Sequence, residues 1–181
     1  MKILVMNGNA VPSGFDDYLA RFTRAAIEHG HEAERIDLRD LKLRTCIGCW
    51  TCWLKTPGLC AMKDDMVALY PKMVAADLLV WASPLVLGTI SALAKTAQDR
   101  MVPLIHPYVE LVDGELHHRH RYAHNADVGV IVAPGADDTE EDLAIVRAFF
   151  ERFSRNTRTR LRLFATSNIP AEEAAREALA A

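Results

Sequence analysis

The residues most able to do chemistry are four cysteines that lie close together in the spacing C-x2-C-x2-C-x7-C. They are Cys46, Cys49, Cys52 and Cys60, and they are all the cysteines of the chain. Thiols at steps of three converge on one point only where the backbone curls tightly, and this geometry suits a [4Fe–4S] cluster. Zinc suits the spacing less well, because structural zinc sites usually pair two C-x2-C knuckles across a longer insert. A redox-active dithiol or plain buried thiols are also compatible with it.

Three loops rich in Gly, Pro, Ser or Asn follow apolar runs and could bind a ligand through backbone N–H groups. They cover residues 7–15, 83–88 and 134–137. The first loop leads into an expected helix, and a helix N-terminus is a natural place for a phosphate. If the apolar runs are parallel strands, the loops meet at the carboxyl edge of the sheet, where such folds bind ligands. Together they predict a concave rim lined by amide groups.

The elements that would position these loops alternate between apolar runs and helical patterns. The first and third runs are almost continuously apolar, which indicates strands covered on both faces, and the run at 32–37 is less apolar. We expect strands at 2–6, 32–37, 77–82, 127–133 and 161–166, and helices that begin near residues 15, 64, 91, 139 and 168. The stretch from 103 to about 125, interrupted by Pro103 and Pro107, is expected to be irregular. The sequence predicts one doubly wound α/β domain over residues 1–181, with a cysteine-containing loop at about 44–63.

Composition narrows the classes of partner. A chain of 181 residues fits one domain with a full core. A net charge of −3 argues against nucleic acid, because phosphate binding needs a basic excess. No apolar run is long enough for a membrane helix or a signal peptide, so we expect no membrane partner and a cytoplasmic protein with reduced thiols.

Two blocks of sequence resemble a known family. Residues 83–100, SPLVLGTISALAKTAQDR, resemble the second flavin loop and following helix of the NAD(P)H-dependent FMN reductases. Residues 46–66, which end in Asp64-Asp65-Met66, are similar to the cysteine stretch of the iron–sulfur flavoprotein branch of that family. The resemblance implies a flavodoxin-like five-stranded parallel sheet with strand order 2-1-3-4-5 and helices on both faces. It also implies bound FMN and a homodimer or homotetramer.

The resemblance assigns cofactor-binding residues in each of the three loops. The FMN phosphate would be held by Asn9, Ser13, Gly14 and Phe15. The isoalloxazine ring would be lined by Ser83, Pro84, Leu85, Val86, Leu87 and Gly88, and bordered by Pro134, Gly135 and Ala136. Amides near the pyrimidine end would favour reduced, anionic flavin, so no side chain need act as a dedicated acid or base.

The first loop departs from the family pattern. Ser13 supplies its single hydroxyl, and Asp16 and Asp17 follow directly. A carboxylate beside a phosphate is repulsive. We expect one of these aspartates to cap the helix and the other to face solvent.

Three functions are compatible with these features. The first is an FMN-dependent NAD(P)H oxidoreductase that passes electrons to a quinone, a flavin or another small acceptor. The second is an iron–sulfur flavoprotein electron carrier with a [4Fe–4S] cluster on the four cysteines. The third is a non-enzymatic flavodoxin-like binding module that has lost FMN.

Other polar and aromatic groups are expected to have structural roles. The histidines at 117, 118, 120 and 124 are interpreted as a solvated connector rather than a metal site. The arginines at 155, 158, 160 and 162 are interpreted as a solvated face. Trp50 and Trp53 are expected to pack within the chain or against another subunit. Asp99 and Arg100 are expected to serve capping and ion pairing.

Overall fold

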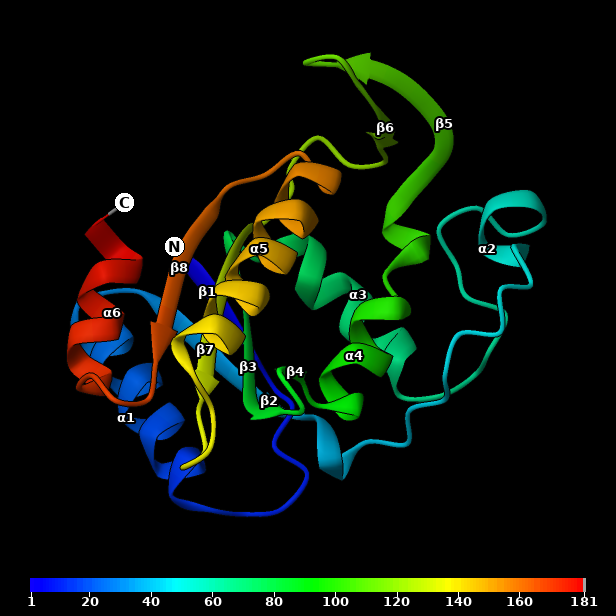
Figure 1. Ribbon diagram of the computed structural model, residues 1–181. Coiled ribbons are helices and arrows are strands. Elements are labelled where there is room, and N and C mark those ends of the chain that lie inside the picture. The colour runs from blue at the N-terminus through cyan, green and yellow to red at the C-terminus, as the bar shows by residue number, and fades with distance from the viewer. Residues whose placement is uncertain (181) are drawn as a thin grey trace.

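The computed structural model describes residues 1–180, so Ala181, the last residue of the expected domain, lies outside the described residues. The strands are β1 (Lys2–Asn7), β2 (Glu32–Asp37), β3 (Leu78–Val86), β4 (Thr89–Ile90), β5 (Ile105–Val112), β6 (Glu115–His120), β7 (Asp127–Ala133) and β8 (Leu161–Thr166). The helices are α1 (Gly14–Glu28), α2 (Thr51–Leu54), α3 (Met66–Ala75), α4 (Ala92–Asp99), α5 (Glu140–Asn156) and α6 (Ala171–Ala180). Two short 3-10 turns, η1 (Leu38–Asp40) and η2 (Val102–Leu104), complete the elements (Figure 1).

The main sheet has the strand order β2-β1-β3-β7-β8, and these strands are parallel to their neighbours. Counted along the chain as parallel strands only, this order is 2-1-3-4-5, so the flavodoxin-like topology is confirmed. The short strand β4 is an addition, since it pairs antiparallel with the end of β3. The parallel arrangement places the ends of β1, β3 and β7 at one edge of the sheet.

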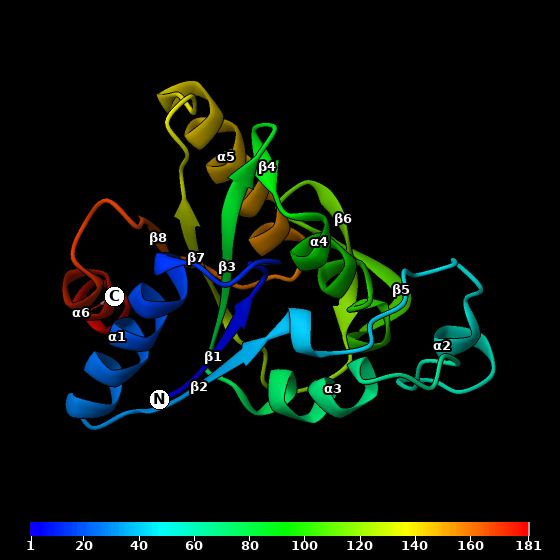
Figure 2. The ribbon, with the colours of Figure 1, turned by 90° about the horizontal axis from the view of Figure 1, so that it is seen from below.

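Two apolar cores lie on the two faces of the sheet, which explains the unbroken apolar runs. Helices α1 and α6 cover one face, and α3, α4 and α5 cover the other (Figure 2). Neighbouring residues of a strand point to opposite faces: Val5 and Val80 are buried in the core of α1 and α6, whereas Met6 and Trp81 are buried in the other. Full burial of each such side chain contributes roughly 1.5–3 kcal/mol.

The helix starts follow capping chemistry. Helix α1 begins after Ser13, and the side chains of Ser13 and Asp16 form a capping box. Asp17 is exposed, so the expectation that one aspartate caps and the other faces solvent is confirmed. At the start of helix α5, the side chains of Thr139 and Asp142 form a second capping box.

The prediction that residues 103–125 are irregular was wrong. Strands β5 and β6 form an antiparallel hairpin there, and Figure 1 shows it projecting from the body of the molecule. The turn between Val112 and Glu115 is made by Asp113 and Gly114, which both have positive φ angles (49° and 83°). Asp-Gly is a strong signal for this two-residue turn, and the two prolines obscured it. Pro107 is accommodated where the pairing is irregular, between Ile105 and Val109.

Among residues 1–180, no helix combines the length and the apolarity that crossing a membrane requires.

Candidate functional site

The structure brings the three loops together at the carboxyl edge of the sheet. The first loop is joined to the segment after β3 by the backbone N–H of Gly8, which donates to Ala82 O (2.7 Å), and by Ser91 Oγ, which donates to Gly8 O (2.7 Å). A Cβ atom on Gly8 would lie 2.6 Å from Ala94 Cβ, so glycine is required for this approach. A Cβ atom on Gly88 would lie 2.9 Å from Asp142 Oδ1, so the β3–β4 turn lies beside the start of α5.

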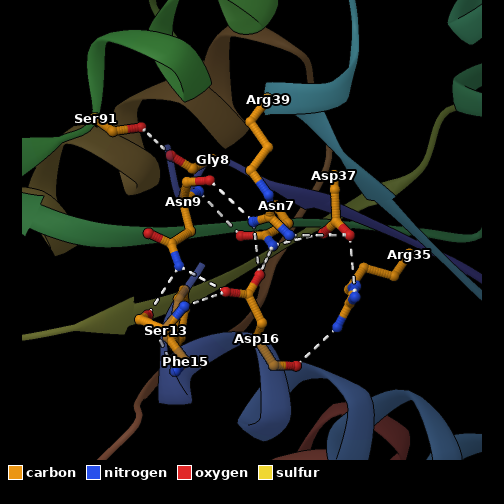
Figure 3. A network of polar contacts seen from close by, with 10 residues as sticks. All are labelled: Asn7, Gly8, Asn9, Ser13, Phe15, Asp16, Arg35, Asp37, Arg39 and Ser91. Atoms are coloured by element: carbon orange, nitrogen blue, oxygen red, sulfur yellow. Dashed lines mark hydrogen bonds and ion pairs between the residues drawn. The ribbon is translucent and has the colours of Figure 1, made fainter. Parts of the chain in front are cut away.

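In the first loop, the carboxylate of Asp16 is the centre of a dense polar network (Figure 3). Its Oδ1 accepts from Asn7 Nδ2 (2.7 Å) and from Arg39 Nη1 (2.7 Å). Its Oδ2 accepts from Asn9 Nδ2 (2.9 Å) and from the backbone N–H of Ser13 (2.8 Å). Each carboxylate oxygen therefore has two donors.

These contacts keep Asp16 ionised. Burial alone would raise the pKa of this carboxyl, but hydrogen bonds from the Ser13 amide, Arg39 and Asn7 outweigh it and lower the pKa to about 2. Arg39 also lies 3.4 Å from Asp37, and Asn7 Nδ2 donates to the same carboxylate (2.6 Å). Arg35 Nη2 also donates to Asp37 (3.0 Å), so two half-buried guanidiniums balance the charges of the two carboxylates.

The network bears directly on the residues assigned to the FMN phosphate. Asn9 Nδ2 and the Ser13 amide are both bonded to Asp16, so a phosphate would have to compete for them. Gly14, the first residue of α1, is exposed and has open space where a side chain would be. Phe15 is buried, and its N–H points to Ser13 Oγ (3.3 Å). The exposed donor at this end of the rim is therefore the N-terminus of α1.

The sequence predicted Asp16 as a source of repulsion or as a helix cap, but gave no sign of its contacts with Asn7 and Arg39 or of the neighbouring Asp37. Asn7 ends an apolar strand, and a polar residue at a carboxyl edge is a usable signal. Arg39 lies 23 residues beyond Asp16, and no local pattern marks that pairing.

The second loop is a tight hairpin turn. Val86 pairs with Thr89, and the two residues between them, Leu87 and Gly88, have φ angles of 51° and 70°. Ser83 is buried, and its Oγ accepts from the backbone N–H of Ser91 (2.8 Å), which fixes the base of the turn. Val86 is 45% exposed and Leu87 is 99% exposed. The rim therefore presents a rigid apolar tip against which a flat ring can pack.

The third loop borders the same space with fewer free donors. The N–H of Gly135 donates to Asp138 Oδ2 (2.6 Å). Pro134 is half-buried and Ala136 is exposed. At this edge the structure exposes the apolar side chains of Val86 and Leu87 and the N-terminus of α1, with the ionised carboxylate of Asp16 beside that N-terminus.

The four cysteines line a small pocket of about 60 Å³, together with Arg100 and Val102. Cys52 is buried, Cys60 is half-buried, and Cys46 and Cys49 are exposed. As the side chains lie, no three His, Cys, Asp or Glu residues among 1–180 are grouped closely enough to hold a metal ion. The pocket thus collects the thiols around one space without forming a finished ligand set.

The buried guanidinium of Arg100 anchors this pocket. It is 1% exposed and makes two hydrogen bonds to Asp64, from Nη1 to Oδ2 (2.7 Å) and from Nη2 to Oδ1 (2.9 Å). Nη2 also donates to Cys60 Sγ (3.3 Å). The expected ion-pairing role of Arg100 is thereby confirmed, and Asp64 belongs to this pair, while Asp65 holds the N-cap position of α3.

The thiols differ in how easily they ionise. Hydrogen bonds from the hydroxyl and amide of Thr51 lower the pKa of Cys49. Burial and the neighbouring thiols raise the pKa of Cys52. Since the thiolate is the reactive and metal-binding form, Cys49 is the better nucleophile of these two.

The histidine-rich segment is not a solvated connector, so that interpretation was wrong. His117 is buried beside Glu115, with 3.2 Å between Nε2 and Oε2. His120 Nε2 and Thr157 O are 2.9 Å apart, and His124 Nε2 and Ala76 O are 2.8 Å apart. These contacts fasten the β5–β6 hairpin and the following segment to the body.

The arginine run is paired rather than merely solvated. Arg158 forms an ion pair with Glu110, and Arg160 and Arg162 both approach Asp127. Trp53 packs within the chain, where its Nε1 donates to Val102 O (3.0 Å). The nearby ring of Trp50 is half exposed.

Comparison with known proteins identifies the family to which the chain belongs. A family model described as "NADPH-dependent FMN reductase" matches residues 1–149, which include all three loops and the cysteine stretch. An iron-sulfur flavoprotein of Methanocaldococcus jannaschii is 39% identical over 105 residues, which are 58% of this chain and 53% of that protein. An iron-sulfur flavoprotein of Archaeoglobus fulgidus is 35% identical over 100 residues, which are 55% of this chain and 48% of that protein. The chain spans about half the length of these relatives.

Solved structures agree on the fold at low sequence identity. An NAD(P)H:quinone oxidoreductase from Methanothermobacter marburgensis superposes with a TM-score of 0.67 at 18% identity, covering 98% of this chain and 95% of the other. A flavone reductase superposes with a TM-score of 0.66 at 17% sequence identity, and the match covers 99% of this chain and 60% of the other. At this level of identity the likeness establishes the flavodoxin-like fold and nothing finer.

Proposed function

Since the chain belongs to the NADPH-dependent FMN reductase family, we propose that it binds FMN at the three-loop rim and transfers electrons from NADH or NADPH to a small acceptor. A quinone, free flavin or another small electrophile would serve as the acceptor. One observation carries this proposal: three loops far apart in sequence meet at one sheet edge, and all of them lie in the matched residues.

The residues of the rim have distinct tasks in this proposal. The amide of Gly14, at the start of α1, receives the phosphate, and the amide of Phe15 joins it by leaving Ser13 Oγ, because a helix N-terminus favours an anion. The side chains of Val86 and Leu87 pack against the ring and exclude water from one face of it. The loops 83–88 and 134–136 orient the ring, and bound FMN supplies hydride and electron transfer.

Asp16 weakens the binding of a phosphate at the N-terminus of α1. Its carboxylate holds the Asn9 amide and the Ser13 N–H, which are the other donors assigned to the phosphate. Arg39, 2.7 Å away, offsets its charge. We therefore expect a working flavin site whose phosphate contributes less affinity than an all-donor loop would.

The direct test is to titrate the purified chain with FMN and with riboflavin, and then to follow NADH and NADPH oxidation with a quinone acceptor. The proposal predicts saturable binding of FMN, tighter than binding of riboflavin, and acceptor-dependent oxidation. Leu87→Gly, which keeps the positive φ angle, should weaken both flavins alike, whereas Leu54→Gly on exposed α2 should change neither. If neither flavin binds, the chain is instead a flavodoxin-like module that has lost FMN.

A second candidate function rests on the cysteine pocket. All four thiols line one space beside the Arg100 guanidinium, and the matched relatives are named iron-sulfur flavoproteins. We propose a [4Fe–4S] cluster on Cys46, Cys49, Cys52 and Cys60, which would make the chain an electron carrier. Anaerobic purification followed by iron and sulfide analysis should give about four irons per chain, and Cys60→Ser should lower that number. Iron-free protein would remove this candidate.

Three further properties are part of the proposal. Residues 1–181 act as one domain, the protein works in the cytoplasm, and it forms a homodimer or homotetramer. Exposed apolar side chains on two projecting hairpins, Leu87 on one and Leu111 and Leu116 on the other, support self-association. Sedimentation velocity on the purified protein measures the oligomer size.

A further inference from the structure

A cavity of about 490 Å³ lies at the edge of the sheet opposite to the three loops. It is lined by Leu79 and Val128, at the amino ends of β3 and β7, and by side chains of α3, α4, η2, α5 and the β5–β6 hairpin. Pockets for small molecules typically measure 300–1,000 Å³. The cavity therefore has room for a small organic ligand, and it shares no lining residue with the rim.

Its walls combine apolar side chains with polar ones, among them three histidines, two asparagines and two threonines. Leu79, Met101, Leu104, Val128 and Phe153 supply much of the apolar surface. The lining includes neither lysine nor arginine, and its one carboxylate, Asp99, is paired with Lys95. Such a surface disfavours an anion and offers no strong attraction to a cation, so it suits an uncharged molecule.

Two of the lining residues carry a buried polar atom without a hydrogen-bond partner in the described chain. They are Gln98, whose Nε2 is unpaired, and His118, whose Nδ1 is unpaired. Gln98 is only 6% exposed, so bulk water does not satisfy its amide. A buried polar group without a partner costs free energy, and a ligand that pairs with it recovers that cost.

The cavity is held open by contacts that do not depend on its contents. The ring of His118 packs on Trp53, with 5.1 Å between ring centroids, and Trp53 is bonded to the backbone of Val102 and Ile105. On the other side, Glu115 pairs with Arg152 of α5 and Glu110 pairs with Arg158, just after the end of α5, so both ion pairs tie the hairpin to this part of the body. A cavity braced in this way is preformed for a ligand.

We propose that this cavity binds an uncharged fused-ring aromatic compound, whose ring carbonyl accepts a hydrogen bond from the Gln98 amide and whose ring N–H pairs with His118 Nδ1. The apolar walls take the rings, and the two unpaired atoms fix their orientation. The inference does not depend on the flavin proposal, because the two sites lie at opposite edges of the sheet.

The probe for the test is 4-quinolone, an uncharged bicyclic compound with one carbonyl and one ring N–H. Chromone, which has the carbonyl but no N–H, and naphthalene, which has neither, are the matched controls. Isothermal titration calorimetry on the full chain measures affinity. Amide chemical shifts in ¹⁵N-labelled protein locate the site, either around residues 98, 118 and 157 or around 83–88.

We expect 4-quinolone to saturate one site, to shift amides around residues 98, 118 and 157, and to bind more tightly than chromone and naphthalene. Gln98→Leu and His118→Phe should each weaken it roughly fivefold, the effect of one lost hydrogen bond. Both substitutions keep the approximate size of the side chain, and phenylalanine at position 118 also keeps the ring packing on Trp53. Thermal unfolding checks that both variants are folded.

Three results would overturn the proposal. The first is the absence of saturable binding by 4-quinolone. The second is equal affinity for 4-quinolone and naphthalene, which would leave the polar atoms without a role. The third is a set of shifts confined to residues 83–88, which would place the probe at the rim and leave the cavity without a ligand.

Discussion

At the scale of single residues, the phosphate end of the rim depends on Asp16. This carboxylate takes donors that a phosphate would otherwise use, and it adds a like charge beside it. We predict that Asp16→Asn binds FMN several-fold more tightly, because neutral asparagine removes the repulsion while keeping the size. Fluorescence titration measures this. Asp17→Asn, one residue further along α1 and exposed, is the matched control, and an equal gain from both variants would contradict the specific role of Asp16.

The same residue gives a pH dependence of stability. The pKa of Asp16 is lowered to about 2 from an ordinary value of 3.8, so the folded state favours the charged form. Its contribution, at most about 2 kcal/mol, is present above pH 3.8 and is lost as the pH falls through about 2. Urea unfolding should therefore show that the stability gap between the wild type and Asp16→Asn narrows below about pH 4. A gap that stays constant from pH 6 to pH 2.5 would contradict this.

Asp64 and Arg100 form the buried ion pair beside the cysteine pocket. Their side chains are 4% and 1% exposed, and the pair is bidentate. We predict that Asp64→Asn lowers the free energy of unfolding by about 3 kcal/mol, because it leaves a buried guanidinium without its counter-charge. Asp99→Asn breaks the pair with Lys95, in which both side chains are about half exposed, and should cost less than about 0.5 kcal/mol. Similar losses of unfolding free energy in the two variants would show that burial does not determine how much the Asp64–Arg100 pair stabilises the protein.

At the scale of elements, the rim exists because β1 and α4 approach closely at Gly8. A Cβ atom there would lie 2.6 Å from Ala94 Cβ and 2.9 Å from Ser91 Oγ. We predict that Gly8→Ala lowers the free energy of unfolding by about 1–3 kcal/mol, since a well-packed contact must open. Gly14→Ala is the control, because nothing lies within 4 Å of its added Cβ and helix α1 should gain slightly. Urea unfolding of both variants measures the difference, and equal stabilities would contradict the close packing at Gly8.

Elements were predictable from sequence where one local rule governs them. Apolar runs identified β1, β3 and β7, the alternation of strands and helices identified the less apolar β2, and the Thr139 to Asp142 pattern identified the start of α5. The hairpin β5–β6 was missed because the prolines were given more weight than Asp113-Gly114. Pro107 is tolerated since it lies where the strand pairing is already irregular. The error was one of competing local signals rather than of missing information.

At the scale of the whole molecule, the features that escaped prediction join distant parts of the chain. Arg39 reaches Asp16 across 23 residues, Arg100 reaches Asp64 across 36, and His124 meets Ala76 across 48. Such pairings depend on how the sheet places its loops, and no spacing in the sequence encodes them. The cavity beneath the hairpin has the same origin, because its walls come from eight separate elements.

The proposed self-association also belongs to the whole molecule, and the hairpin offers its clearest test. Leu111 and Leu116 are paired across β5 and β6, and they are 72% and 71% exposed, so they form one apolar patch on a projecting arm. Val109, two residues before Leu111 and on the same face of β5, is 50% exposed. Apolar groups gathered on an arm mark a contact surface. We predict that the double variant Leu111→Asp, Leu116→Asp sediments as a smaller species than the wild type, because charges buried in an interface without partners are costly.

Leu54 is the control for that prediction, since it is 76% exposed and belongs to α2 rather than to the hairpin. Leu54→Asp should leave the sedimentation coefficient unchanged while adding the same type of charge. Thermal unfolding at one protein concentration shows whether the hairpin variant is folded, and both leucines are exposed enough that their replacement should not disturb the core. If the wild type and the double variant sediment alike, the arm does not hold subunits together, and the exposed Leu87 turn becomes the surface on which self-association depends.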